Sequence, residues 1–303
     1  MKTISCKILL TYLVVALLGS CSSGSEEEPL PPTPPVDKKI PITLNCSVTA
    51  NTRVTDTGYD SGDKIGLYVV NYDNGTAGTL ANSGNHVNNV CFTYNGTWTP
   101  TSPIYWKDET TPADFYCYYP YGTPTDVTAH AFSVKTDQST SDAYKACEFL
   151  YGKATKVTPT EKAVNIMTAH LFSCAVIKVA AGNGFTEESL DEANVSVKLN
   201  GCKTDATINL RDGSVTATGD ANTITPLKEE KQYKALIVPQ TINADNFITV
   251  TIDGREYHLK KEFTFVSGKR YQFTATVSKT SNGINVGINP WDDDDKDYGG
   301  SAE

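Results

Sequence analysis

The chain has 303 residues and a formal net charge of −9. Such an acidic chain lacks the basic face that binds phosphates, which excludes nucleic acid as an expected partner. Hydrophobic residues make up 39% of the chain, enough to build a core, so full disorder is excluded as well. The 16 Tyr against only 2 Met favour strands over helices, because aromatic side chains suit the pleated surface of a sheet.

The N-terminal segment has the pattern of an export signal. Two lysines precede an apolar run at residues 8–18, which is shorter than the roughly 20 residues of a transmembrane helix. Residues 18–21 read LGSC and resemble a bacterial lipobox, in which the cysteine is acylated. We therefore predict that residues 1–20 are a signal peptide and that a lipid on Cys21 anchors an outer-membrane lipoprotein. The alternative is an ordinary signal peptide followed by an unrelated cysteine.

Residues 21–39 form the predicted lipidated, flexible linker. This segment is rich in proline, and Pro-rich segments are extended, semi-rigid spacers. Its three consecutive glutamates, residues 26–28, also resemble the export tags of surface-exposed lipoproteins, although a solvated linker would have the same composition. The expected location is the cell surface, where the spacer holds a folded body away from the membrane.

From residue 40 onward, short alternating runs are separated by hairpin dipeptides. Asn-Gly and Asp-Gly pairs supply the positive φ that a tight hairpin needs. Short strands between polar turns, without a helical stripe over 12 residues, favour an all-β fold built of β-sandwiches. The dipeptides are Asn95-Gly96, Asp212-Gly213 and Asp253-Gly254.

The length suggests two tandem domains, since domains commonly have roughly 100–150 residues. A polar segment at residues 155–162 separates a Tyr-rich half from a simpler series of strands, which places the join near residue 160. We therefore expect an N-terminal sandwich at residues 40–160, a C-terminal sandwich at residues 161–291 and an acidic tail at residues 292–303.

No residue pattern indicates catalysis. The four histidines share no metal-ligand spacing, and no nucleophile elbow, phosphate loop or dinucleotide fingerprint occurs. The aspartate run at residues 292–295 lacks the register of an EF-hand loop. We predict no enzyme activity, no cofactor and no metal. A pair of catalytic carboxylates, which has no local signature, is the enzyme hypothesis that stays open.

Six of the 8 cysteines lie in the body of the chain. In an exported protein six cysteines allow 15 pairings. The body is large enough to fold without disulfides, and Cys117 alternates with aromatic residues as a small buried hydrophobe would. Mostly free thiols are favoured, with one or two disulfides as the alternative. The six are Cys46, Cys91, Cys117, Cys147, Cys174 and Cys202.

A series of short motifs, in this order and spacing, resembles the fimbrillin family, the subunits of type V pili. The resemblance covers residues 40–291, and each motif is weak without the others. The motifs are NTRV at residues 51–54, SGDKIGLY at 61–68, PIYW at 103–106, DFYCYYP at 114–120, EFLYG at 148–152, HLFS at 170–173, GKRYQF at 268–273 and INPW at 288–291.

The resemblance implies two transthyretin-like β-sandwiches and assembly by strand exchange. An arginine-specific protease would cut after Arg53, before Val54, and remove the first strand, so that a strand from a neighbouring pilus subunit fills the groove. Residues 40–50 match the removable strand, and alternating residues in it fit one buried face. These groove-filling residues are Ile42, Leu44, Cys46 and Val48. Expected partners are other pilus subunits, the outer membrane through Cys21, the processing protease and a ligand on a host or bacterial surface.

Two departures from the family pattern refine this expectation. The tail at residues 292–303 has almost none of the alternating apolar residues that a donor strand needs, and six body cysteines are many for a pilin. We therefore expect a minor, tip or anchor subunit of the pilus. The alternative function is a surface-exposed glycan-binding lipoprotein, in which Trp98, Trp106 and the aromatic run at residues 116–121 form a sugar-stacking platform.

Overall fold

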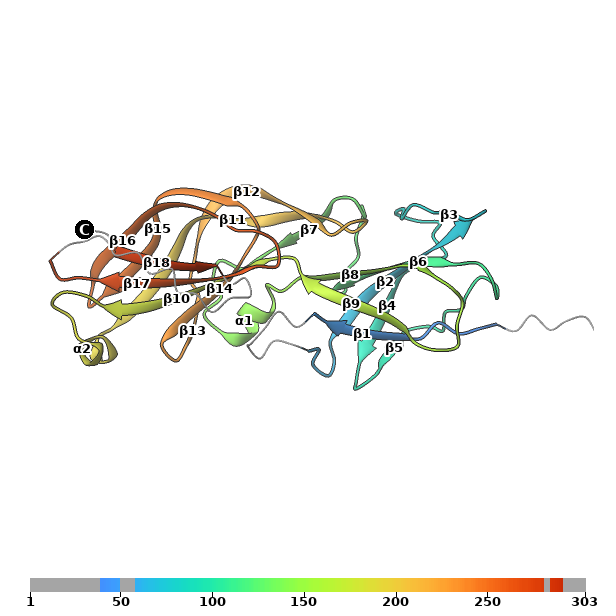
Figure 1. Cartoon of the computed structure of the whole chain (residues 1–303), viewed down its shortest axis with the longest axis horizontal. Helices are drawn as coiled ribbons and strands as arrows, with labels where there is room; N and C mark the ends of the chain where they lie inside the picture. Colours follow the sequence, from blue (N-terminus) through green and yellow to red (C-terminus); the bar gives the residue numbers. More distant parts are fainter. Residues whose placement is uncertain (1–38, 50–57, 281–283, 291–303) are drawn as a thin grey trace, which may run out of the picture. The chain divides into compact units, whose positions relative to one another are not determined.

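The computed structural model describes residues 39–49, 58–280 and 284–290, with the backbone alone described at residues 244–245 and 284–290. The chain divides into two compact units, residues 1–38 and 39–303, and every described residue lies in the second. The described part contains eighteen strands and two short helices (Figure 1). This composition confirms the all-β prediction. Neither of these helices is long and apolar enough to cross a membrane.

The first sheet has eight strands in the order β1-β9-β8-β6-β2-β4-β5, with β3 paired to β2 (Figure 1). β1 therefore lies at one end of this sheet and β5 at the other. The strands are β1 (Leu44–Val48), β2 (Lys64–Asp73), β3 (Thr76–Ala77), β4 (Val87–Tyr94), β5 (Trp98–Pro100), β6 (Ala113–Tyr119), β8 (Leu150–Val157) and β9 (Val164–His170).

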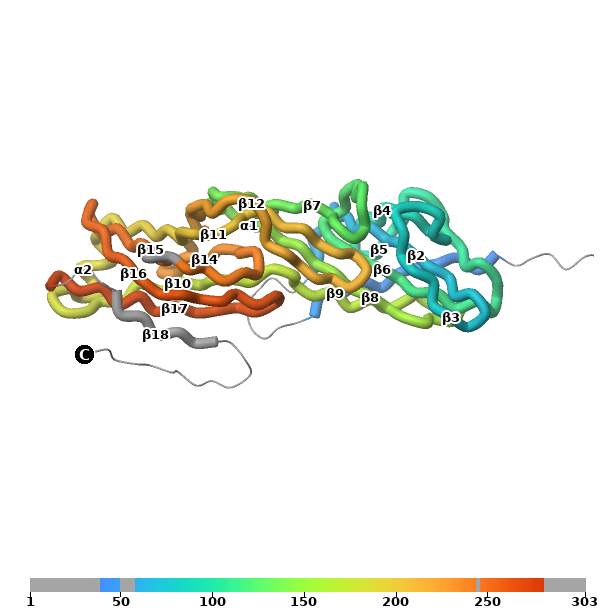
Figure 2. Tube along the Cα trace, turned by 90° about the horizontal axis from the view of Figure 1, so that it is seen from above, coloured from blue at the N-terminus to red at the C-terminus, as the bar shows by residue number. Residues whose placement is uncertain are grey.

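Two further sheets contain the rest of the strands. One has the order β13-β14-β10-β17-β18, and the other has the order β12-β11-β15-β16 with β7 paired to β11. Figure 2 shows β10 and β17 side by side. The strands are β7 (His130–Ser133), β10 (Ser173–Ala181), β11 (Val195–Asn209), β12 (Ser214–Ile224), β13 (Leu227–Glu229), β14 (Gln232–Ile237), β15 (Thr241–Ile252), β16 (Arg255–Thr264), β17 (Arg270–Val277) and β18 (Ile284–Pro290).

The three hairpin dipeptides lie where the sequence predicts them. Gly96 connects β4 to β5, Gly213 connects β11 to β12, and Gly254 connects β15 to β16, each with a positive φ. Asp253 also has a positive φ of 48°, so both central residues of the last turn are left-handed, as a two-residue hairpin requires.

Both helices are short and capped at their N-termini. α1 (Ser141–Lys145) begins at Thr140, whose side chain accepts a hydrogen bond from the backbone N–H of Ala143. α2 (Glu187–Glu192) begins with a capping box between Thr186 and Ser189. The caps explain why helix forms at these two points of a chain otherwise rich in strand formers.

The core of the first sheet contains the inward face of β1. We call this cluster the β1 core. Its apolar side chains come from strands at both ends of the sheet and from its middle. Its buried members are Ile42, Leu44, Cys46, Ile65, Leu67, Val69, Val87, Phe92, Trp98, Trp106, Ala113, Phe115, Cys117, Tyr119, Leu150, Val164 and Ile166.

The middle strand β6 is buried on both faces. Phe115 and Cys117 belong to the β1 core, whereas Tyr116 and Tyr118 belong to a second cluster that contains Phe149. Successive side chains of a strand point to opposite faces of its sheet. The alternation around Cys117 thus separates two cores, and Cys117 itself is a buried free thiol, as the sequence predicts.

The change from the first sheet to the next comes later in the chain than residue 160. β9 still pairs with β1 and β8, so the chain reaches the next sheet with β10, after residues 171–172. Conversely, β7 precedes residue 160 and pairs with β11. The join near residue 160 does not coincide with the change of sheet, and the division into two domains stays a prediction.

Candidate functional site

The candidate site is the edge of the first sheet that β1 occupies. β1 runs parallel to β9, with Leu44 opposite Val164 and Val48 opposite Thr168. At the two ends of this pairing, the N–H of Val164 donates to the carbonyl of Thr43 at 2.8 Å, and the N–H of Thr49 donates to Thr168 at 2.7 Å. β9 is the one strand with which β1 forms a ladder among the described residues.

Residues 40–42, shortly before β1, pair on the side away from β9. The N–H of Ile42 donates to the carbonyl of Ile104 at 2.9 Å, and the N–H of Trp106 donates to the carbonyl of Ile40 at 2.9 Å. Pro41 and Tyr105 form the antiparallel bridge between these bonds. The segment of residues 40–48 therefore changes partner midway, from residues 104–106 to β9. It makes few backbone hydrogen bonds on either side.

The inward face of the segment fills the β1 core. Ile42, Leu44 and Cys46 are only 3%, 6% and 5% exposed, and Val48 is half-buried against the same cluster. The intervening side chains, such as Thr43, point to solvent. This is the alternation that the sequence predicts. Since burying one large aliphatic side chain stabilises by about 1.5–3 kcal/mol, apolar packing is the main force that holds the segment in place.

Trp98 connects β1 to the opposite end of the same sheet. Its indole N–H donates to the carbonyl of Cys46 at 3.0 Å. Trp98 belongs to β5, the last strand of the sheet. β1 is thus held by the backbone of β9 on one side and by a side chain of β5 on the other.

A small polar group lies inside this apolar core. The sulfur of Cys46 lies 3.6 Å from the sulfur of Cys117 and 3.6 Å from the hydroxyl of Tyr59. The Thr168 hydroxyl donates to the carbonyl of Ser47 at 3.1 Å, so in its 2.7 Å contact with Tyr59 the tyrosine is the donor. Burial raises the pKa of Tyr59 far above its ordinary value, which keeps this donor protonated.

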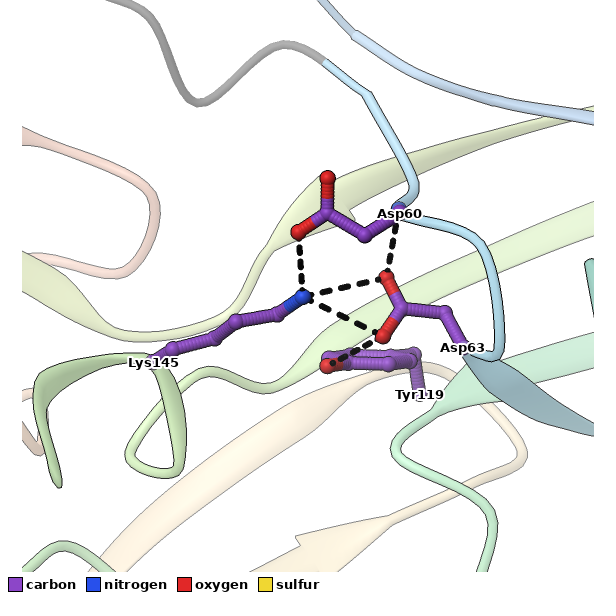
Figure 3. A network of polar contacts seen from close by, with 4 residues as sticks. All are labelled: Asp60, Asp63, Tyr119 and Lys145. Carbon is purple, nitrogen blue, oxygen red and sulfur yellow. Dashed lines mark hydrogen bonds and ion pairs between the residues drawn. The ribbon is translucent and has the colours of Figure 1, made fainter. Parts of the chain in front are cut away.

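The chain after residues 50–57 is fastened by a polar network that we call the Lys145 clamp (Figure 3). Lys145 of α1 contacts Asp60 at 2.6 Å and Asp63 at 3.3 Å. Asp63 also accepts hydrogen bonds from the N–H of Asp60 and the hydroxyl of Tyr119. The hydrogen bond from Lys145 lowers the pKa of Asp60, so the carboxylate stays charged. The clamp fixes residues 60–63 to the body independently of β1.

The other predicted site residues fall into two groups. Cys21, Arg53 and Val54 lie outside the described residues. The proposed aromatic residues do not form an exposed platform, because Trp98, Trp106 and the aromatic residues of β6 are buried and Tyr121 is half-buried.

Sequence reasoning missed the contacts made by residues distant in the chain. Tyr59 packs on Trp98 at 4.7 Å between ring centroids, in an edge-on arrangement. Neither this contact nor the proximity of Cys46 to Cys117 leaves a local pattern, because the partners are separated by many residues. The one available signal was the alternation that places Cys46 and Cys117 each on a buried face.

Comparison with known proteins identifies the family. The sequence model of the fimbrillin-like family matches residues 52–291. The chain belongs to the fimbrillin-like family. The match confirms the resemblance that the order of motifs indicates.

Two proteins named as fimbrial subunits are similar to this chain. A protein named as fimbrium subunit Fim1C of Bacteroides uniformis is 26% identical over 299 residues, which cover 94% of each chain. A protein named as fimbrium tip subunit Fim1C of Bacteroides ovatus is 27% identical over 187 residues, 55% of this chain and 34% of that one. A crystal structure described as a cell adhesion protein of Bacteroides ovatus has a TM-score of 0.64 at 21% identity and covers 85% of this chain and 99% of its own. At that identity the structural likeness shows the fold alone.

Proposed function

We propose that this fimbrillin-like chain is a structural and adhesive subunit of a cell-surface pilus, assembled by strand exchange at the β1 edge. The observation that carries the proposal is that, within the described part of the chain, β1 has a ladder partner on one side only, while its inward side chains fill a closed apolar core. A strand in this position can leave without opening the middle of a sheet. Its departure would expose the ladder groups of β9 and apolar pockets, which a strand from a neighbouring subunit can fill. The relatives named as fimbrium subunits support the location in a pilus.

Processing at the Arg53–Val54 bond would release the strand. β1 ends at Val48, and the Lys145 clamp begins at Asp60. A cut after Arg53 therefore separates all of β1 from a segment that Tyr59 and the clamp keep attached to the body. The responsible partner would be an arginine-specific protease.

Export as a lipoprotein precedes this step in the proposal. A lipid on Cys21 would anchor the unprocessed chain in the outer membrane, and the Pro-rich linker would extend from it. Cleavage after Arg53 then removes the anchor together with β1. Release from the membrane and opening of the groove would thus be one event.

Within the pilus, we assign the chain a minor, tip or anchor position. Residues 292–303 supply few apolar side chains, and four consecutive aspartates would bring charges into an apolar groove at a cost of several kcal/mol each. The backbone of residues 284–290 is already paired with β17 as β18, so donating it would mean peeling it from its own sheet. The partial match to a fimbrium tip subunit agrees with this position. The proposed role is structural, without catalysis. Adhesion to a ligand on a host or bacterial surface is a further part of this role.

The glycan-binding alternative has no observation in its favour. It requires a group of exposed rings, but most of the residues suggested for it lie in the interior and Tyr121 is half-buried.

The experiment is digestion of the purified chain with an arginine-specific protease. N-terminal sequencing should find a new start at Val54, and the trimmed chain should bind a second pilus subunit that the intact chain does not bind. An Arg53→Lys variant should resist the cut and stay unbound, whereas Arg211→Lys, in the turn after β11, should behave like the wild type. Binding by the uncleaved chain, or cleavage only at the other arginines, would contradict the proposal.

A further inference from the structure

Two thiols meet inside the β1 core. Cys46 lies in the middle of the edge strand β1, and Cys117 lies on β6 in the middle of the sheet. Their sulfurs are 3.6 Å apart, both residues are buried, and both thiols are free. One thiol therefore belongs to the strand that the proposed function removes, and the other belongs to the body that stays behind.

We propose that Cys46 and Cys117 form a disulfide when the chain folds in the presence of a disulfide oxidant, and that this bond locks β1 into the sandwich. The two thiols give up two protons and two electrons as the Sγ–Sγ bond forms. The S–S bond of the oxidant breaks and is reduced to two thiols. The cross-link itself follows from the geometry, and its consequence for assembly rests on the proposed function.

The two sulfurs need to move only a short distance toward each other to form the bond. A disulfide has a sulfur–sulfur distance of about 2.05 Å, so the two sulfurs must close a gap shared between two side chains. β6 is held by strands on both sides, whereas β1 is an edge strand with one ladder partner and can move toward it. The two sulfurs are in direct contact, and the Tyr59 hydroxyl lies at the same distance, 3.6 Å, from the Cys46 sulfur.

The timing follows from burial. The hydrogen bond between the two thiols raises the pKa of Cys117 and lowers the pKa of Cys46, so protonation alone does not protect the pair. Burial does, because both sulfurs lie in a closed core that an oxidant in solution does not reach. The oxidant must therefore meet the thiols before β1 docks, during folding after export, and the finished bond is then shielded from reductants by the same core.

The consequence concerns the trimmed chain. A cut after Arg53 breaks the backbone, but in the oxidised protein β1 stays tied to β6 through Cys46. In the reduced protein the same cut leaves only hydrogen bonds and apolar packing to hold the strand. The redox history of the chain would decide whether a processed subunit opens its groove.

The first part of the experiment tests the cross-link. The full chain is refolded with glutathione disulfide or with dithiothreitol, free thiols are alkylated after unfolding, and unreduced peptides are mapped by mass spectrometry. The oxidised sample should contain one peptide pair joined through Cys46 and Cys117, lighter by two hydrogens than the sum of its parts. Cys46→Ala should abolish the pair, and Cys202→Ala, at another buried cysteine, should leave it. Alkylation of both thiols in the oxidised sample, or a different pairing, would overturn the proposal.

The second part tests the lock. Both samples are cut after Arg53, and the β1 fragment is followed in denaturant without reductant. It should stay with the body in the oxidised sample and separate in the reduced one, and a labelled peptide of residues 40–49 should replace it only after reduction. Equal replacement in both samples would overturn the lock. If the cross-link forms but the reduced, trimmed chain takes up no strand, the strand-exchange function fails while the cross-link stands.

Discussion

β1 and β10 are the corresponding strands of two sheets, and they differ in how they are flanked. Each runs parallel to a strand that follows later in the chain, β1 to β9 and β10 to β17. β10 also pairs antiparallel with β14 on its other side, from Ser173 to Lys178, so it lies inside its sheet. Among the described residues, the other side of β1 has a bridge at Pro41 and the side chain of Trp98 but no second ladder.

This difference separates a strand that can be exchanged from one that cannot. Removing β10 would leave unpaired N–H and C=O groups on two strands, and such buried groups are costly. Removing β1 exposes one edge, and an added strand repairs it. The inward residues of both strands are buried, so packing does not distinguish the two strands. What distinguishes them is that β1 lies at the edge of its sheet and β10 lies inside its sheet.

The largest effect should come from removing β1. A chain that starts at Val54 loses the burial of Ile42, Leu44 and Cys46. At roughly 1.5–3 kcal/mol for each large apolar side chain, Ile42 and Leu44 alone account for about 3–6 kcal/mol, a large share of a typical folding free energy. Chemical denaturation and binding of a hydrophobic dye should show a weakened chain with exposed core. A chain that starts at Lys39 and keeps β1 is the control, and equal stability of the two would refute the account.

The next effect compares one buried residue from each strand. Leu44→Ala in β1 and Ile177→Ala in β10 should each lower the free energy of unfolding by about 2–5 kcal/mol. Hydrogen exchange should distinguish them. The β1 substitution should lower protection mainly at β9, and the β10 substitution should lower protection throughout its sheet. Thr43→Ala, at an exposed position of the same segment, should change stability by less than about 0.5 kcal/mol. If both substitutions lower hydrogen-exchange protection over equally large parts of their sheets, β1 is no more separable from its sheet than β10.

A smaller effect should follow from the contact across the sheet. Trp98→Phe removes the indole donor to the Cys46 carbonyl and should cost about 1–2 kcal/mol. Trp106→Phe is the matched control, because its indole N–H is buried without a hydrogen-bond partner among the described residues. Removing that donor should cost less. If Trp106→Phe is the more destabilising of the two, ring packing rather than the hydrogen bond holds this side of β1.

The smallest effect concerns the opposite face of the first sheet. His130 of β7 packs beside Tyr118 and Phe149, and burial lowers its pKa. The unfolded chain therefore binds a proton more readily than the folded chain, and stability should fall as pH drops through about 6.5 toward the lower folded value. His130→Gln should flatten this slope in denaturation curves between pH 8 and 5. If the slope is unchanged in this variant, titratable groups other than His130 cause the pH dependence.

Local patterns predicted the β1 face and the hairpins but not the pairing of strands. Alternation at residues 42–48 can be predicted because buried positions carry apolar side chains and exposed positions carry polar ones. β9 joins the first sheet by pairing with β8, the strand before it, and with β1, more than 100 residues earlier. The polar segment before Val164 nevertheless has the composition of a domain boundary. The alternation in β6 predicts that Cys117 is buried, but the local sequence cannot reveal the second core that Tyr116 and Tyr118 enter.

The central claim is that β1 can be replaced by a strand from another molecule. The direct measurement starts from reduced chain cut after Arg53, from which the β1 fragment has been removed in denaturant. The body is refolded with a fluorescent peptide of residues 40–49, and binding is followed by anisotropy and native mass spectrometry. The account predicts saturable binding of one peptide per chain, and loss of binding for a peptide carrying Leu44→Asp, because a carboxylate would enter the apolar core. Equal binding of both peptides, or a body that refolds to full stability without either, would contradict it.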